Sequence, residues 1–300
     1  MTSSPFLYLV TIMTWGTSWF AIKFQLGVVA PEISLIYRFG LAALILLFYC
    51  IATQRSLHFT LRDHVFVLLQ GACLFSGNYL IFYHATALLA SGLVAVIFSS
   101  VMFMNMFNGA LFLRRPVEPQ VMFGAVLGLG GITLVFWPEI VRAGVGSGVM
   151  RGLLLSLGAT YLASLGNIIS ARNQQQGLPV LQTNALGMGY GTLLMLLVAL
   201  LLGSTFNFDN RLSYSVSLIY LAVFASVLAF GAYLTLVGRI GADRAAYATV
   251  IFPIVALVIS SLFEDFHWSP VALTGVVFVL VGNVLITGLP KRLRLRRTPL

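Results

Sequence analysis

Polar and aromatic side chains recur at helical spacing inside long apolar runs of the sequence. Thr11, Thr14 and Ser18 lie at i, i+3 and i+7, close to one face of a helix, and Trp15 and Trp19 stand beside that face. Polar groups facing lipid are costly, so such a face is expected to point into a helix bundle or toward water. Hydroxyls beside indole rings favour noncovalent binding of a small amphipathic molecule.

Other runs carry comparable polar or aromatic sets. In the run 64–86, Gln70, Gly77 and His84 repeat every seven residues, with Tyr79 and Tyr83 in an adjoining arc. The candidate substrate-binding residues are Trp15, Ser18, Trp19, Tyr79, Tyr83, His84, Met102, Asn105, Asn167, Tyr233 and Tyr247. Rings, amides and hydroxyls with little charge suit a substrate that has an apolar body and a zwitterionic or weakly polar head.

Some of these patterns have a packing interpretation. Small residues are common where membrane helices approach closely, so the GxxxG pairs Gly124/Gly128 and Gly187/Gly191 are expected to be packing motifs.

The composition determines which elements must hold these residues. Of 300 residues, 59% are apolar and 8% are charged, whereas about a quarter are charged in soluble proteins. A bilayer core about 30 Å thick needs roughly 20 residues of helix. The fold class is therefore an all-α integral membrane protein, because the runs are about twice the length of barrel strands. The ten predicted transmembrane helices are 5–24, 33–52, 64–86, 89–113, 120–137, 149–171, 180–203, 213–237, 242–262 and 270–289.

These spans leave too little chain for a soluble catalytic or nucleic-acid-binding domain, despite a net charge of +9. Basic residues tend to stay in cytoplasmic loops, and most of them fall on the side of the N-terminus. We therefore expect a multi-pass protein of a bacterial-type inner (plasma) membrane with both termini cytoplasmic. The expected partners are a small-molecule substrate and the lipid bilayer, with no nucleic acid and no cofactor or metal.

The chain resembles itself when it is shifted by about half its length. A shift of 151 places Pro119 on Pro270, and a shift of 146 places Arg38 on Asn184. Because five helices is an odd number, the second copy must be inverted in the membrane, as in many transporters. The predicted parts are a first five-helix repeat, a second inverted five-helix repeat and a basic cytoplasmic tail: 1–143, 148–290 and 291–300.

Three stretches carry a resemblance to a known family: WGTSWFAIK from Trp15, YRFGLAALILL from Tyr37 and GADRAAYATVIFPIVALVISSLFED from Gly241. They resemble the EamA family of the drug/metabolite transporter superfamily. The resemblance implies a ten-helix carrier with a central cavity, frequently an exporter of amino acids or related metabolites; among members, we favour an aromatic amino-acid exporter. The sequence departs from the family pattern at Phe252, where Glu often precedes the proline. Glu264 fits the acidic position common after this helix.

The expected mechanism is facilitated alternating access, with Pro253 as a hinge inside its helix. All carboxylates fall in loops or at helix ends, so His84 is the nearest candidate for proton coupling. The main alternative is a carrier of anionic metabolites such as phosphorylated sugars, which would need buried cations. Lys23 and Arg38 are the only candidates, and both are expected at the membrane interface. An intramembrane enzyme is disfavoured because no nucleophile and base cluster together.

Overall fold

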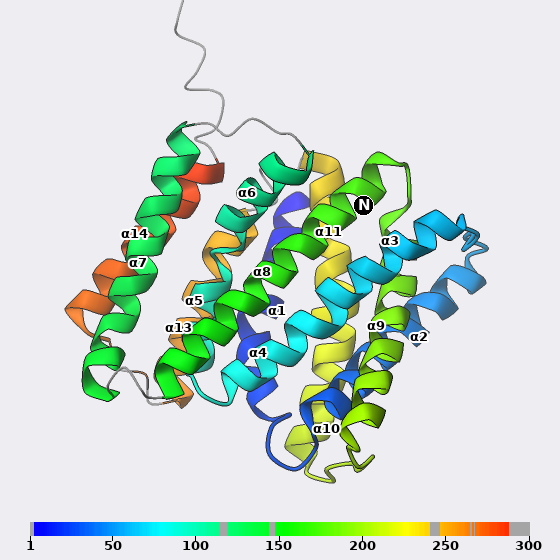
Figure 1. Ribbon diagram of the computed structural model, residues 1–300, viewed down its shortest axis with the longest axis horizontal. Coiled ribbons are helices and arrows are strands. Elements are labelled where there is room, and N and C mark those ends of the chain that lie inside the picture. Colours follow the sequence, from blue (N-terminus) through cyan, green and yellow to red (C-terminus); the bar gives the residue numbers. More distant parts are fainter. Residues whose placement is uncertain are drawn as a thin grey trace, which may run out of the picture.

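The computed structural model describes residues 3–113, 119–143, 148–240, 247–264, 266 and 268–287, and these residues contain helices and no strand. Figure 1 shows them as one bundle. The α-helices are α1 (Ser4–Lys23), α2 (Pro31–Ala52), α3 (Leu61–Ala72), α4 (Asn78–Thr86), α5 (Ser91–Phe98), α6 (Val101–Leu113), α7 (Pro119–Ala143), α8 (Gly148–Gln175), α9 (Val180–Leu202), α10 (Leu212–Ile219), α11 (Ala229–Ile240), α13 (Tyr247–Phe263) and α14 (Pro270–Thr287). Two π-helical segments, η1 (Cys73–Gly77) and η2 (Tyr220–Leu228), join α3 to α4 and α10 to α11.

The predicted all-helical membrane class is confirmed. Among the described residues, seven segments are long and apolar enough to cross a bilayer, and shorter apolar helices accompany them at Met122–Pro138, Ile251–Phe263 and Pro270–Leu285. The apolar part of α7 ends at Pro138, close to the predicted end of this span at 137, but the helix itself continues to Ala143. Backbone groups that a proline frees in a membrane helix can be satisfied by neighbouring groups, so the helix need not stop there.

The predicted run 89–113 is a broken helix, with Ser99 and Ser100 between α5 and α6. The Ser99 hydroxyl donates to the Val96 carbonyl and the Ser100 hydroxyl donates to the Ile97 carbonyl, each at 2.6 Å. Side chains of this kind compete with the backbone for helical hydrogen bonds. The break is therefore stabilised by the two serines.

Glycine contacts bring pairs of helices together. A Cβ on Gly131 of α7 would lie 2.6 Å from the carbonyl oxygen of Gly275 on α14, and one on Gly71 of α3 would lie 2.3 Å from that of Gly187 on α9. Such approaches are possible only without a side chain. The packing expected for the GxxxG pairs is present, since a Cβ on Gly282 of α14 would also lie 2.5 Å from the carbonyl oxygen of Gly124 on α7. Figure 1 shows α7 and α14 as a pair at one edge of the bundle.

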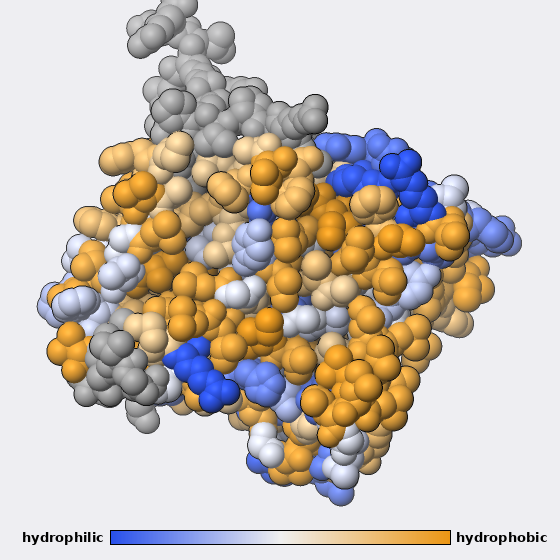
Figure 2. Space-filling view, viewed as in Figure 1, coloured by the Kyte–Doolittle hydropathy of each residue, from blue (hydrophilic) through white to orange (hydrophobic). Residues whose placement is uncertain are grey.

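Polarity runs opposite to that of a soluble protein. Large apolar side chains such as Phe48, Leu44 and Leu201 are exposed, while Gln25, Gln70 and other polar residues are buried. Figure 2 shows apolar residues over most of the visible face. The bundle thus presents large apolar side chains to lipid and keeps polar residues among the apolar ones of its core.

Candidate functional site: a central cavity

A cavity of about 110 Å³ lies inside the bundle. This is several times the roughly 10–15 Å³ that one water needs by the same kind of measure. Side chains from α1, η1, α4, α5, α6, α8, α9, α11 and α13 line it. Segments far apart in the sequence therefore converge on one space.

Most of the predicted candidates lie together around this cavity. Eight of the eleven line it, namely Trp15, Ser18, Trp19, Tyr79, Met102, Asn105, Asn167 and Tyr233. The helical spacing used in the sequence therefore selected residues that share a space, and their binding of a substrate stays a prediction.

Of the other three candidates, two lie outside the lining and the third has no described side chain. Tyr83 is fully buried outside it, and His84 is exposed near the end of α4. The side chain of Tyr247 lies outside the described residues. The seven-residue repeat from Gln70 to His84 misled because η1 lies between them: a π turn adds a residue, which rotates the following helix relative to the preceding one. Gln70 is accordingly buried and His84 is not.

Aromatic rings form one part of the wall. The Trp15 ring centroid lies 5.1 Å from that of Phe230 and 5.2 Å from that of Tyr233, while Trp19 lies 5.1 Å from Phe82. The Trp15 indole N–H also donates to the carbonyl of Ala225 in η2, at 3.2 Å. This bond fixes the indole ring against a backbone whose regular α-helical pairing is interrupted.

A network of amides begins at the cavity wall with Asn184. Asn184 accepts a hydrogen bond from Gln70 Nε2 at 3.1 Å, and Gln70 Oε1 accepts one from Asn173 at 2.9 Å. Arg172 then donates to Asn173 Oδ1 at 3.1 Å and lies 3.6 Å from Asp63. This amide network leads from the cavity to the helix ends where α3 begins and α8 finishes.

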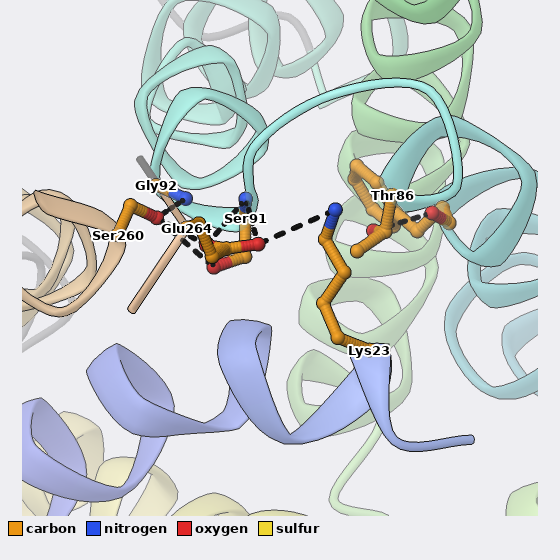
Figure 3. A network of polar contacts seen from close by, with 7 residues as sticks. Lys23, Thr86, Ser91, Gly92, Ser260 and Glu264 are labelled. Carbon is orange, nitrogen blue, oxygen red and sulfur yellow. Dashed lines mark hydrogen bonds and ion pairs between the residues drawn. The ribbon is translucent and has the colours of Figure 1, made fainter. Parts of the chain in front are cut away.

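A cluster of polar contacts around a single carboxylate, that of Glu264, lies at the opposite helix ends (Figure 3). Glu264, whose side chain is 9% exposed, accepts hydrogen bonds from the backbone N–H and hydroxyl of Ser91 and from the hydroxyl of Ser260, and its Oε1 lies 3.3 Å from Lys23 Nζ. The Ser260 hydroxyl also accepts a bond from the Gly92 N–H at 2.7 Å. A negative group suits the beginning of α5, where backbone N–H groups are free. Lys23 is therefore ion-paired, rather than only extended toward the interface as the sequence suggested.

The sequence matches the EamA-like transporter family twice, over residues 2–137 and over residues 150–288. The chain belongs to this family. The suspected family resemblance is thereby confirmed, and transport across a membrane is the activity of the family.

Relatives of this EamA protein are similar over nearly their full length. An "Uncharacterized transporter YvbV" of Bacillus subtilis is 25% identical over 95% of this chain and 92% of its own. A "Probable amino-acid metabolite efflux pump" of Salmonella typhimurium is 23% identical over 92% of each chain. One solved structure has the same fold, with a TM-score of 0.69 and 14% identity over 98% of this chain and 99% of its own.

The EamA chain departs from the sequence-based expectation at Arg38. This side chain was expected at the interface, but it is only 1% exposed. Helix α2 begins at Pro31, two residues before the predicted start, so Arg38 stands about two turns inside it. The position of Arg38 along the helix did not show which way its side chain points. The guanidinium points into the bundle, and its central carbon lies 4.5 Å from the centroid of the Tyr79 ring.

The candidate set omitted the rest of the lining. Those residues are Ile22, Leu74, Asn78, Phe82, Phe98, Val101, Ala163, Ser170, Asn184, Phe230 and Phe252. The polar members could have been found by the rule that polar residues avoid lipid. The apolar members carry no such signal, since they stand in helices that are apolar throughout. Among the described residues, no group of three His, Cys, Asp or Glu side chains is placed to hold a metal.

Proposed function

We propose that this protein exports amino acids, aromatic or otherwise apolar, or related small metabolites by facilitated alternating access through the central cavity. The observation that carries the proposal is an amphipathic cavity inside the bundle of a member of a transporter family. A relative named as an amino-acid metabolite efflux pump supports the substrate class.

The proposal includes ten membrane spans in two inverted repeats of five. Two successive family matches of similar length support a repeat of this size. The proposed orientation has both termini cytoplasmic in an inner (plasma) membrane, as the basic residues favour. Two halves of opposite orientation can exchange conformations and so expose a central site to each face in turn.

The Glu264 cluster and the amide network each join the two matched halves of the chain. Lys23 and Ser91 belong to the first half and Glu264 to the second. At the other ends, Asp63 of the first half pairs with Arg172 of the second. We infer that these clusters are the two gates, and that alternating access breaks one while the other holds.

Pro253 is the proposed hinge. It stands inside α13, directly after Phe252, which lines the cavity. A proline cannot donate to the carbonyl four residues before it, so the helix bends more easily there. A change of bend would move Phe252 relative to Trp15, whose ring centroid lies 6.3 Å away.

Proton coupling is not part of the proposal. Within the described residues, no carboxylate or histidine lines the cavity, although coupled carriers use such groups within the membrane. His84 is exposed at a helix end. We expect transport to be equal at two pH values and unchanged by His84→Ala.

Counterflow in proteoliposomes tests the function. Vesicles are loaded with one unlabelled amino acid, its labelled form is added outside, and a panel is worked through from phenylalanine. The expected result is saturable accumulation that Trp19→Ala in the cavity weakens several-fold, as loss of aromatic contacts predicts. Trp137→Ala, on the exposed face of α7, is the matched control and should leave transport unchanged. Absence of accumulation for every amino acid, with folded protein, would reject this substrate class.

A further inference from the structure

Arg38 places a positive charge in the interior of the bundle. Its Nε donates to the hydroxyl of Ser226 in η2 at 3.2 Å, and its ring contacts are Phe39 and Tyr79, at 4.9 and 4.5 Å. Its Nη1 is buried and has no hydrogen-bond partner among the described residues. The guanidinium therefore has unused donors away from water.

The charge also lacks a counterion. Throughout the part of the chain that the structure describes, no carboxylate forms an ion pair with Arg38. Glu32, the acidic residue on the same helix, instead accepts a hydrogen bond from the Ser204 hydroxyl. A buried charge without a partner is strongly unfavourable. An anion from outside the chain would relieve this cost.

A second unsatisfied group lies beside the first. Tyr83 is 0% exposed, and its hydroxyl has no hydrogen-bond partner at normal distance among the described residues; the Arg38 guanidinium is close enough to act on the hydroxyl oxygen both through its charge and as a donor. Arg38 and Tyr83 thus present two neighbouring O–H and N–H donors without an acceptor. One carboxylate, which accepts at two oxygens, would satisfy both.

The Tyr79 ring connects Arg38 to the cavity. Arg38 stacks on this ring, and Tyr79 is part of the lining. Rotation of the Tyr79 side chain would therefore uncover the guanidinium toward the cavity. Even without contact, a cation this close to the cavity favours a negative group at the Tyr79 wall.

We propose that Arg38 and Tyr83 form a carboxylate-binding subsite behind Tyr79, so that the transported substrate must carry a carboxylate. The proposal rests on the function proposed above and narrows its substrate class. The carboxylate binds at the subsite while the apolar body lies among rings such as Trp15 and Trp19. Neutral and purely cationic molecules of the same shape are excluded because they leave the two donors unpaired.

The experiment measures binding directly, through quenching of tryptophan fluorescence in the purified protein. The probes are 3-phenylpropionate, which has the carboxylate without the amine, and 2-phenylethylamine, which has the amine without the carboxylate. We expect the carboxylate to bind at least about tenfold more tightly, since a hydrogen bond to a charged group contributes roughly that factor or more. Equal binding of the two, or no binding of 3-phenylpropionate, would overturn the subsite.

Variants separate the role of the charge from a structural role. Arg38→Gln is expected to weaken 3-phenylpropionate binding about 10- to 100-fold and to leave 2-phenylethylamine binding unchanged, with Arg38→Lys between. Arg55→Gln, in the exposed loop that follows α2, is the control. If Arg38→Gln does not fold, Tyr83→Phe removes one hydroxyl and should lower carboxylate affinity several-fold. Equal effects on both probes would contradict the subsite. Amino-acid counterflow without carboxylate selection would reject the subsite but keep the function.

Discussion

The ammonium group of Lys23 lies 3.3 Å from a carboxylate oxygen of Glu264, which the second half of the chain supplies. The same carboxylate binds the first backbone N–H of α5 at Ser91. Three helix ends, from α1, α5 and α13, therefore depend on one side chain. In the mechanism proposed above, this contact is one gate, and it holds only while the carboxylate is charged and in place.

Glu264→Gln is predicted to open this end of the cavity more often. The amide keeps the size of the side chain but loses the ion pair and the charge-assisted bonds, each worth about 1.5–3 kcal/mol. A cysteine placed at Ser18, with Cys50 and Cys73 replaced, should react with a membrane-impermeant thiol reagent about tenfold faster or more. Asp209→Asn is the matched control, because Asp209 pairs with Arg211 inside one loop. An unchanged labelling rate in Glu264→Gln would contradict the gate.

Gly131→Ala is predicted to destabilise the protein by about 1–3 kcal/mol, the usual cost of overpacking. The new Cβ would lie 2.6 Å from the Gly275 carbonyl oxygen, so backbone must move. Gly130→Ala is the control one residue away, since a Cβ there meets nothing within 4 Å. The measurement is the unfolding midpoint of each variant in the same detergent. Equal midpoints in the two variants would show that α7 and α14 can move apart without loss of stability, and would contradict the prediction.

Gln70→Leu is predicted to lower the free energy of unfolding by about 1–2 kcal/mol, the range for hydrogen bonds between membrane helices. The substitution leaves Asn184 and Asn173 without the amide that each contacts. Denaturant titration of the folded protein measures the change. Gln176→Leu, exposed beyond α8, should have little effect, and a similar loss in both variants would argue against the network.

Stability in acid is predicted to depend on Asp209, which lies in the loop between α9 and α10. Hydrogen bonds from the Arg211 side chain and backbone hold the pKa of this carboxyl below its ordinary value of 3.8. A lowered pKa stabilises the folded protein above pH 3.8, and this contribution is lost as the pH falls through the folded-state pKa. Unfolding midpoints at about pH 6 and about pH 3 should therefore differ less in Asp209→Asn than in the parent. If the midpoint changes by the same amount between the two pH values in Asp209→Asn and in the parent, the prediction is wrong.

Helix positions could be predicted from the sequence because a membrane span needs a long apolar run, and few other structures tolerate one. Candidates such as Trp15 and Asn167 could be predicted for a related reason, since polar and aromatic residues form faces at helical spacing. The lining by Phe98 and Phe252 could not be predicted, because an apolar residue in an apolar helix is equally suited to lipid, core or cavity.

Errors arose where a helix departs from regular geometry or where direction matters. His84 was aligned with Gln70 by a period that η1 interrupts. Arg38 was judged by its distance from the helix end, although its side chain points toward η2. A shift of 146 pairs Arg38 with Asn184, which lines the cavity. That pairing was the available signal that Arg38 belongs to the interior.

The two π segments begin at Cys73 and Tyr220, one in each family match and at corresponding places within them. Each gives its helix one residue more than a regular ladder needs. If the π turn moves along the helix by exchanging one hydrogen bond at a time, the part of the helix beyond it rotates about the helix axis. Two of the helices that line the cavity therefore contain a point about which they can rotate. Such a rotation needs neither a loop nor the unfolding of a helical turn.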